Sequence, residues 1–183
     1  MTENPILYQK LPALQIAALK TRVDTRDQIP PLFERLRMAC GGALCGEPMV
    51  IFHGGAVKDG FVVEAAYPVS RAVETDDVHT RELEPAPALT TLHAGPHQTM
   101  RETVLRVYDY MGRHAMTTSL FRREIYRRLD PAAPENNLTE VQVILHEWER
   151  LCAEGVEAVL GADARQTLMQ GIDSITPDSS FED

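Results

Sequence analysis

Aromatic residues, cysteines and long apolar runs are all scarce in this chain of 183 residues. The three cysteines, Cys40, Cys45 and Cys152, are an odd number and have no second Cys/His pair at metal-ligand spacing. They predict reduced thiols and a cytoplasmic location, not a disulfide framework or a metal site. No apolar run approaches the roughly 20 residues of a membrane span, and the first residues lack a signal pattern. No membrane association is therefore expected.

Basic charge is also deficient. The sequence has 18 Lys and Arg against 27 Asp and Glu, which gives a formal net charge of −9. Nucleic-acid binding depends on neutralising phosphates with Lys and Arg, and no helix-turn-helix, zinc-finger or basic-region pattern is visible. We therefore expect no direct binding of nucleic acid. With 44% hydrophobic and 25% charged residues, the composition is that of an ordinary globular domain.

The spacing of apolar residues predicts a strand–helix–strand–strand order that occurs twice. In the first half, a helix opened by Pro30 and Pro31 lies among strands near residues 14–20, 48–53 and 61–69, with another strand near 78–83. In the second half, the strand "ALTTLHAG" leads into a helix opened by Pro96, and the strands "SLFRREIYRR" and "LTEVQVILH" follow. The predicted class is α+β, with two tandem units forming an antiparallel sheet, helices on one face and a ligand groove between the units.

The predicted organisation is a single domain over residues 1–170. Its repeat halves cover about 8–75 and 76–146, and a C-terminal helix covers about 147–170. The acidic tail 171–183 is rich in Ser and Pro and is expected to be flexible.

One segment has a competing interpretation. "NNLTEVQVILHEWERLC" could form a single helix, with Asn137 as the N-cap and Glu140 completing a capping box. The alternation of "EVQV" and its β-branched residues favour a strand instead, with the helix starting near Glu147.

The order of several short motifs resembles the GyrI-like family, also called bacterial transcription-activator effector-binding domains. The matching stretches are "VVEAAYPV", "LTTLHAGPH" running into a helix, "REIY", a Pro-rich turn and "TEVQV", and the resemblance covers about residues 8 to 146. It implies two α+β units around a pseudo-twofold axis with a ligand in the groove between them. It also implies a buried glutamate among aromatic rings that binds cationic, planar, lipophilic molecules. By motif position this glutamate is Glu124, with Tyr126 beside it.

Strand alternation extends this candidate site. Glu124 and Tyr126 share one face of their strand, and Ile125 takes the other. If Ile125 faces a helix, the open face carries the ligand-binding candidates Glu124, Tyr126, Glu140, Gln142 and, from the first half, Glu64, with Tyr67 and Tyr108 as stacking rings. The alternative from the residues alone is that Arg122, Arg123 or Arg127 pairs with Glu124 as an ordinary surface ion pair.

The predicted function is that of a stand-alone, multidrug-binding type of effector domain that senses or sequesters a cationic or aromatic lipophilic compound. One alternative is a hydrolase of reactive, cyclopropane-type toxins with Glu124 as the catalytic carboxylate. Another is a protein partner, as for gyrase-modulating relatives. No cofactor or metal is expected, because His93 and His97 straddle the turn at Gly95-Pro96 and need not share a face.

Overall fold

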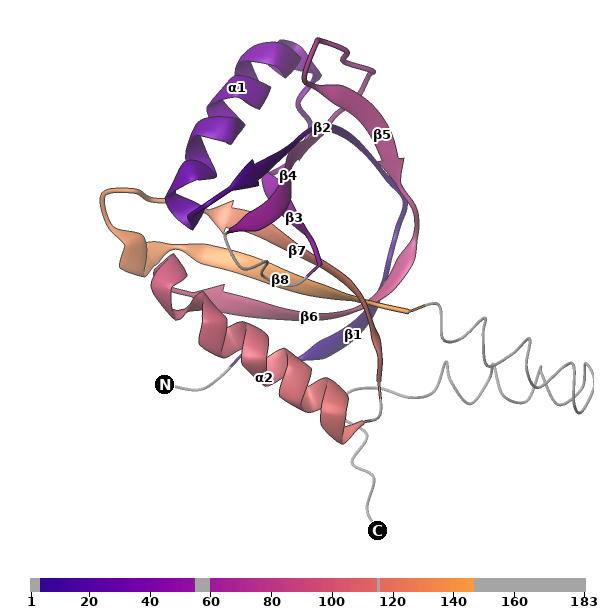
Figure 1. Cartoon of the computed structure of the whole chain (residues 1–183), viewed down its shortest axis with the longest axis vertical. Coiled ribbons are helices and arrows are strands. Elements are labelled where there is room, and N and C mark those ends of the chain that lie inside the picture. The colour runs from indigo at the N-terminus through magenta and orange to yellow at the C-terminus, as the bar shows by residue number, and fades with distance from the viewer. Residues whose placement is uncertain (1–3, 55–59, 115, 147–183) are drawn as a thin grey trace, which may run out of the picture.

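One antiparallel sheet holds the strands of the described part of the chain, which covers residues 4–54, 60–114 and 116–146 of a computed structural model. Across the sheet the strands follow the order β1 (Leu7–Leu11), β6 (Ala86–Ala94), β8 (Leu138–Leu145), β7 (Thr118–Arg128), β3 (Met49–His53), β4 (Phe61–Pro68), β2 (Leu14–Val23) and β5 (His79–Leu83). The sheet is curled, and helices α1 (Pro30–Cys40) and α2 (Met100–Arg113) lie to one side of it (Figure 1).

The strand order is symmetric about the central pair β7 and β3. On one side lie β2, β3 and β4 with α1 inserted after β2, and on the other lie β6, β7 and β8 with α2 inserted after β6. The predicted α+β class and antiparallel sheet are confirmed. The outer strands exchange between the units, because β1 pairs with β6 and β5 pairs with β2. Strand β1 was not predicted, since most of its residues are exposed and its sequence "LYQKL" lacks a clear period.

Both helices cover the same face of the sheet, and each packs on its own unit. Helix α1 has Pro at its first turn and buries Leu32, Phe33 and Leu36, four residues or fewer apart, against β2, β3 and β4. Helix α2 buries Met100, Val104, Val107 and Met111 against β6 and β8. The central strands β7 and β3 therefore lie between the part of the sheet that α1 covers and the part that α2 covers.

The opposite face of the sheet is also apolar. A second cluster there includes Ile16, Met49, Ile51 and Ile125, with Leu83 from the end of β5 packed against it. The run from β5 to β6 arches on this side, away from the helices (Figure 1). Hydrophobic side chains thus point to both faces of the central strands, as they do in sheets that are covered on both sides.

The competing helix over the segment that starts at Asn137 is not observed up to residue 146, because Leu138–Leu145 forms strand β8. The predicted C-terminal helix and acidic tail lie outside the described residues. Within the described ranges, neither helix has the length and apolar character needed to cross a membrane.

Candidate functional site

Glu124 lies on the central strand β7, and its side chain is completely shielded from solvent. Its neighbours across the ladder are Val50 of β3 and Val141 of β8, so it shares the helix-covered face with two apolar residues. A carboxylate in such surroundings is costly to keep charged unless other groups compensate it. Its contacts show which groups do so.

Two arginines converge on this carboxylate. Arg26, in a short 3₁₀ turn (Arg26–Gln28) between β2 and α1, donates from Nη1 to Oε2 at 2.7 Å and from Nη2 to Oε1 at 2.9 Å. Arg122, two residues before Glu124 on β7, lies 3.1 Å from Oε1 through Nη2. The Tyr126 hydroxyl donates to Oε2 at 3.4 Å. The site thus holds one carboxylate and two guanidinium groups.

The ionisation of the cluster follows from these contacts. Burial raises the pKa of Glu124, but the hydrogen bonds and charge of Arg26 and the charge of Arg122 bring that pKa below its ordinary value. Burial, together with the negative charge of Glu124, raises the pKa of Tyr126 well above its ordinary value. Near neutral pH, Glu124 is therefore ionised and Tyr126 is a protonated donor.

Aromatic rings pack around the site, and one of them lies against both guanidinium groups. The guanidinium carbons of Arg26 and Arg122 lie 4.9 Å and 4.4 Å from the ring centroid of Phe52, within the range of cation–π attraction. The ring of Tyr126 meets Phe33 edge-on at 5.4 Å and His97 at the same distance. The carboxylate, the cations and the rings form what we call the Glu124 cluster.

A cavity of about 10 Å³ adjoins the cluster, which is roughly the space of a single water molecule. Arg26, Phe33, His97 and Tyr126 contribute to its lining. The Nδ1 atom of His97 is buried and has no hydrogen-bond partner among the described residues. Burial and the charge of Arg26 lower the pKa of His97, so this ring tends to be neutral. The Nδ1 atom of His97 is thus left to form a hydrogen bond with a ligand or a water molecule.

The sequence-based assignment of faces was wrong for β7. Glu124 and Tyr126 do share a face, but it is the face under the helices, where Tyr126 packs in the α1 core. Ile125 takes the opposite face with Ile51 and Met49. The inference that an apolar residue must face a helix failed because both faces of this sheet are apolar.

The other candidate residues lie elsewhere. Glu140 receives hydrogen bonds from Arg127 at 3.0 Å and from Gln142 at 2.8 Å, on the face away from the helices. Tyr67 packs at the α1 core and meets Phe33 edge-on at 5.9 Å, whereas Tyr108 packs against the α2 core. Tyr67 therefore lies in the same core as Tyr126, because both rings contact Phe33, whereas Glu140, Gln142 and Tyr108 lie apart from Glu124. The ligand-binding roles of these residues stay predictions.

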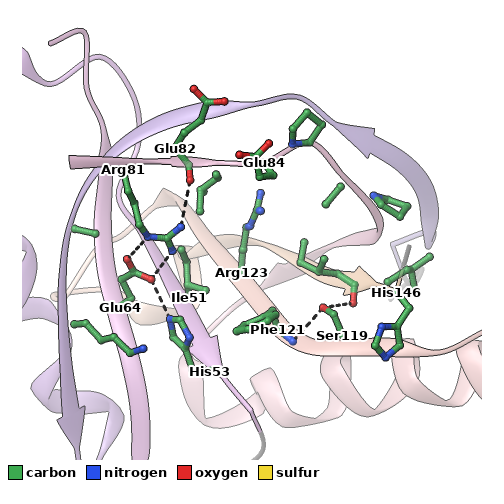
Figure 2. A pocket seen from close by; sticks show the side chains of 18 of the residues that line it. Ile51, His53, Glu64, Arg81, Glu82, Glu84, Ser119, Phe121, Arg123 and His146 are labelled. Atoms are coloured by element: carbon green, nitrogen blue, oxygen red, sulfur yellow. Dashed lines mark hydrogen bonds and ion pairs between the residues drawn. The ribbon is translucent and has the colours of Figure 1, made fainter. Parts of the chain in front are cut away.

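Glu64 lies in a second, much larger site. A cavity of about 840 Å³ opens on the face away from the helices, and Figure 2 shows Glu64 on its wall between Arg81 and His53. Arg81 donates to the two carboxylate oxygens at 2.7 Å and 2.6 Å, and His53 Nε2 lies 2.9 Å from Oε2. Burial raises the pKa of Glu64, but the hydrogen bonds from Arg81 and His53 bring it below its ordinary value.

Several residues of these sites were missed by the sequence analysis. Arg26 lies in the polar stretch "VDTRDQ", which has no periodic apolar pattern that would predict an element there. Its contact with Glu124 joins residues 98 positions apart in the sequence. Arg81 and Arg123 lie in strands that were predicted, but the pairing of Arg81 with Glu64 and the place of Arg123 in the large cavity depend on the tertiary fold. Phe52 could have been found, because it occupies in the first predicted half the position that Tyr126 occupies in the second.

Metal ligands do not gather in the part of the chain that the structure describes, where no group of three or more His, Cys, Asp or Glu could hold an ion. His93 instead contacts Thr103 Oγ1 at 2.8 Å and the Pro96 carbonyl at 3.1 Å.

Comparison with solved structures identifies the fold. The C-terminal domain of EcmrR superposes with a TM-score of 0.68 at 16% identity, covering 78% of this chain and 98% of that one. In an EcmrR–DNA complex the TM-score is 0.71 at 16% identity, covering 79% of this chain and 58% of that chain. This chain has the fold of the EcmrR C-terminal domain. It spans little more than half of the EcmrR chain in that complex.

Two further solved structures share this fold. A hydrolase from Listeria innocua aligns with a TM-score of 0.59 at 12% identity, over 78% of this chain and 92% of that one. SAV2435, whose structure was solved with bound tetraphenylphosphonium, aligns with a TM-score of 0.52 at 14% identity, over 81% and 97%. No protein-family model and no curated protein matches the sequence. At these identities the likeness establishes the fold alone.

Proposed function

We propose that this chain is a small-molecule-binding domain of the GyrI-like type, and that it takes a lipophilic cation at the Glu124 cluster. The observation that carries the proposal is the position of Arg26. Its planar cation lies on a buried carboxylate and over the ring of Phe52. These are the partners that an aromatic or quaternary cation would use. Arg26 thus fills the site as an internal substitute for the ligand.

The contacts of Arg26 make it the more readily displaced of the two arginines. It comes from a three-residue 3₁₀ turn, and its side chain remains 24% exposed to solvent. Arg122 lies on the same strand as Glu124 and is 15% exposed. Exchange of Arg26 for a ligand cation leaves the charge around Glu124 unchanged, while Arg26 regains water. A ligand that brings more apolar surface than a guanidinium gains burial in this exchange.

The cavity beside Arg26 also supports the displacement of this side chain by a ligand. Its present volume admits only a water-sized group, but Arg26 itself forms part of the wall, so its departure enlarges the space. The unpartnered Nδ1 of His97 and the rings of Phe33 and Tyr126 then border the vacated position. The structure of SAV2435 with tetraphenylphosphonium is a precedent for a lipophilic cation in a protein of this fold.

A calorimetric titration with tetraphenylphosphonium tests the proposal. The wild type is compared with Arg26→Ala, Glu124→Gln and the control Arg71→Ala, whose arginine is exposed. Removing Arg26 abolishes a charged hydrogen-bonding competitor, so affinity should rise about 10- to 100-fold, the equivalent of about 1.5–3 kcal/mol. Glu124→Gln should weaken binding by a similar factor, and Arg71→Ala should match the wild type.

Far-UV circular dichroism and thermal melting show whether each variant is folded before it is titrated. If Arg26→Ala binds no more tightly than the wild type while folded, Arg26 does not occupy the ligand position. If folded Glu124→Gln binds as the wild type does, the carboxylate does not hold the cation.

Hydrolysis of a strained, cyclopropane-type compound is the second candidate function, supported by the shared fold with the Listeria innocua hydrolase. The lowered pKa of Glu124 favours a role as a base or a charge stabiliser over that of a general acid. Mass spectrometry of such a compound incubated with wild type and Glu124→Gln separates the two functions. Turnover that the variant loses identifies an enzyme, whereas an unchanged compound supports the binding domain. The predicted protein partner stays a prediction.

A further inference from the structure

The large cavity lies on the sheet face opposite the Glu124 cluster. Its volume of about 840 Å³ is within the range of pockets for small organic ligands, about 300–1,000 Å³. Its floor is formed by β2, β3, β4 and β7, and the connection from β5 to β6 over residues 83–87 closes one side (Figure 2). Apolar side chains dominate this lining, among them Ile51, Leu83, Phe121 and Ile144.

Arg123 points into this cavity from the centre of β7 (Figure 2). It lies opposite Ile51 on β3 and Gln142 on β8, and only 9% of the residue is exposed. No hydrogen bond or ion pair joins its guanidinium to any residue within the described ranges. Burial, together with the charge of Arg81, lowers the pKa of Arg123 to about 10, which leaves the group charged near neutral pH.

The nearby carboxylates do not neutralise Arg123. Both oxygens of Glu64 are engaged by Arg81, and one of them also by His53. Glu82 and Glu84 line the cavity at the exposed end of β5, where water solvates them. The guanidinium therefore presents five N–H donors to the cavity and has no acceptor among the described residues, so that a ligand or water is left to complete it.

We propose that this cavity binds an amphipathic organic carboxylate, with the carboxylate on Arg123 and the apolar body against Ile51, Phe121 and Ile144. The planar guanidinium fork matches the two oxygens of a carboxylate. The apolar walls exclude water and select a lipophilic body. A cation is disfavoured beside Arg123, whose positive charge is not paired with a carboxylate of the described residues, whereas the charge of Arg81 is compensated by Glu64. This site depends on different residues from the Glu124 cluster and does not rest on the function proposed above.

Calorimetric titrations with decanoate and 2-naphthoate test the assignment, with decylamine as the probe of opposite charge. The proteins are the wild type, Arg123→Met, Arg123→Lys and the control Arg71→Ala. Methionine keeps much of the arginine volume without its charge, and lysine keeps the charge without the fork. A thermal melt of each variant establishes that it is folded.

The expected result is that the wild type binds at least one of the two carboxylates and that Arg123→Met weakens this binding at least tenfold. The carboxylate affinity of Arg123→Lys should fall between those of the wild type and Arg123→Met, whereas that of Arg71→Ala should match the wild type. Decylamine should not compete for the site. The assignment is overturned if the wild type binds neither carboxylate, or if folded Arg123→Met binds as well as the wild type.

Discussion

Replacing Glu124 by glutamine removes the negative charge that the two arginines of the cluster share. Arg26 and Arg122 would keep two positive charges in a site where their side chains are 24% and 15% exposed. Breaking a buried ion pair by removing one partner costs about 3–5 kcal/mol, because the remaining charge is uncompensated. We therefore expect Glu124→Gln to lower the free energy of unfolding by that amount.

Urea denaturation followed by circular dichroism measures this change directly. For a domain of this size, the same loss corresponds to a fall in Tm of roughly 6–20 °C. A double-mutant cycle with Arg26→Ala isolates the contribution of the Arg26–Glu124 contact, because directly bonded residues show coupling energies of about 0.5–3 kcal/mol. A loss below about 1 kcal/mol for Glu124→Gln, typical of exposed ion pairs, would refute the reasoning. Strictly additive single variants would refute the pairing of Arg26 with Glu124.

Three further predictions concern other parts of the molecule. The pKa of Glu64 is lowered in the folded state, so its contribution to stability is present above its ordinary pKa and is lost as pH falls through the folded value. Glu64→Gln should accordingly flatten the dependence of Tm on pH in the acid range, and a profile equal to that of the wild type would contradict this. Arg123→Met should leave the free energy of unfolding unchanged or raise it, because it removes a buried charge without a partner. If urea denaturation showed that Arg123→Met lowers the free energy of unfolding by more than about 1 kcal/mol, Arg123 would not be a charge without a partner. Leu36→Ala should cost about 2–5 kcal/mol in the α1 core, whereas Met38→Ala, at an 85% exposed position of the same helix, should change stability by less than about 0.5 kcal/mol. Equal effects of these two substitutions would contradict the packing of α1.

The secondary structure was largely predictable because local signals agree with the fold. Pro30 and Pro31 mark the start of α1, and the period-two alternation of "EVQV" distinguishes β8 from a helix. The outer strand β1 was missed, since a mostly exposed strand carries little periodic signal. Its pairing with β6, about 80 residues along the chain, is set by tertiary contacts that no local pattern encodes.

The candidate site was predictable only in part. Glu124 and Tyr126 were placed together by their spacing and by family resemblance, and the structure does bring them within hydrogen-bonding distance. Which face they occupy could not be read from alternation, because Ile125 on the same strand is as well packed on the other face. Arg26 lies in an irregular turn, and its side chain reaches Glu124 only through the tertiary fold.

A crystal structure of the protein with tetraphenylphosphonium tests the central claim most directly. The account predicts that the phosphonium lies within about 6 Å of the Phe52 ring, beside the Glu124 carboxylate, with Arg26 turned out to solvent. A structure in which Arg26 keeps both hydrogen bonds to Glu124 while the cation binds elsewhere would contradict it.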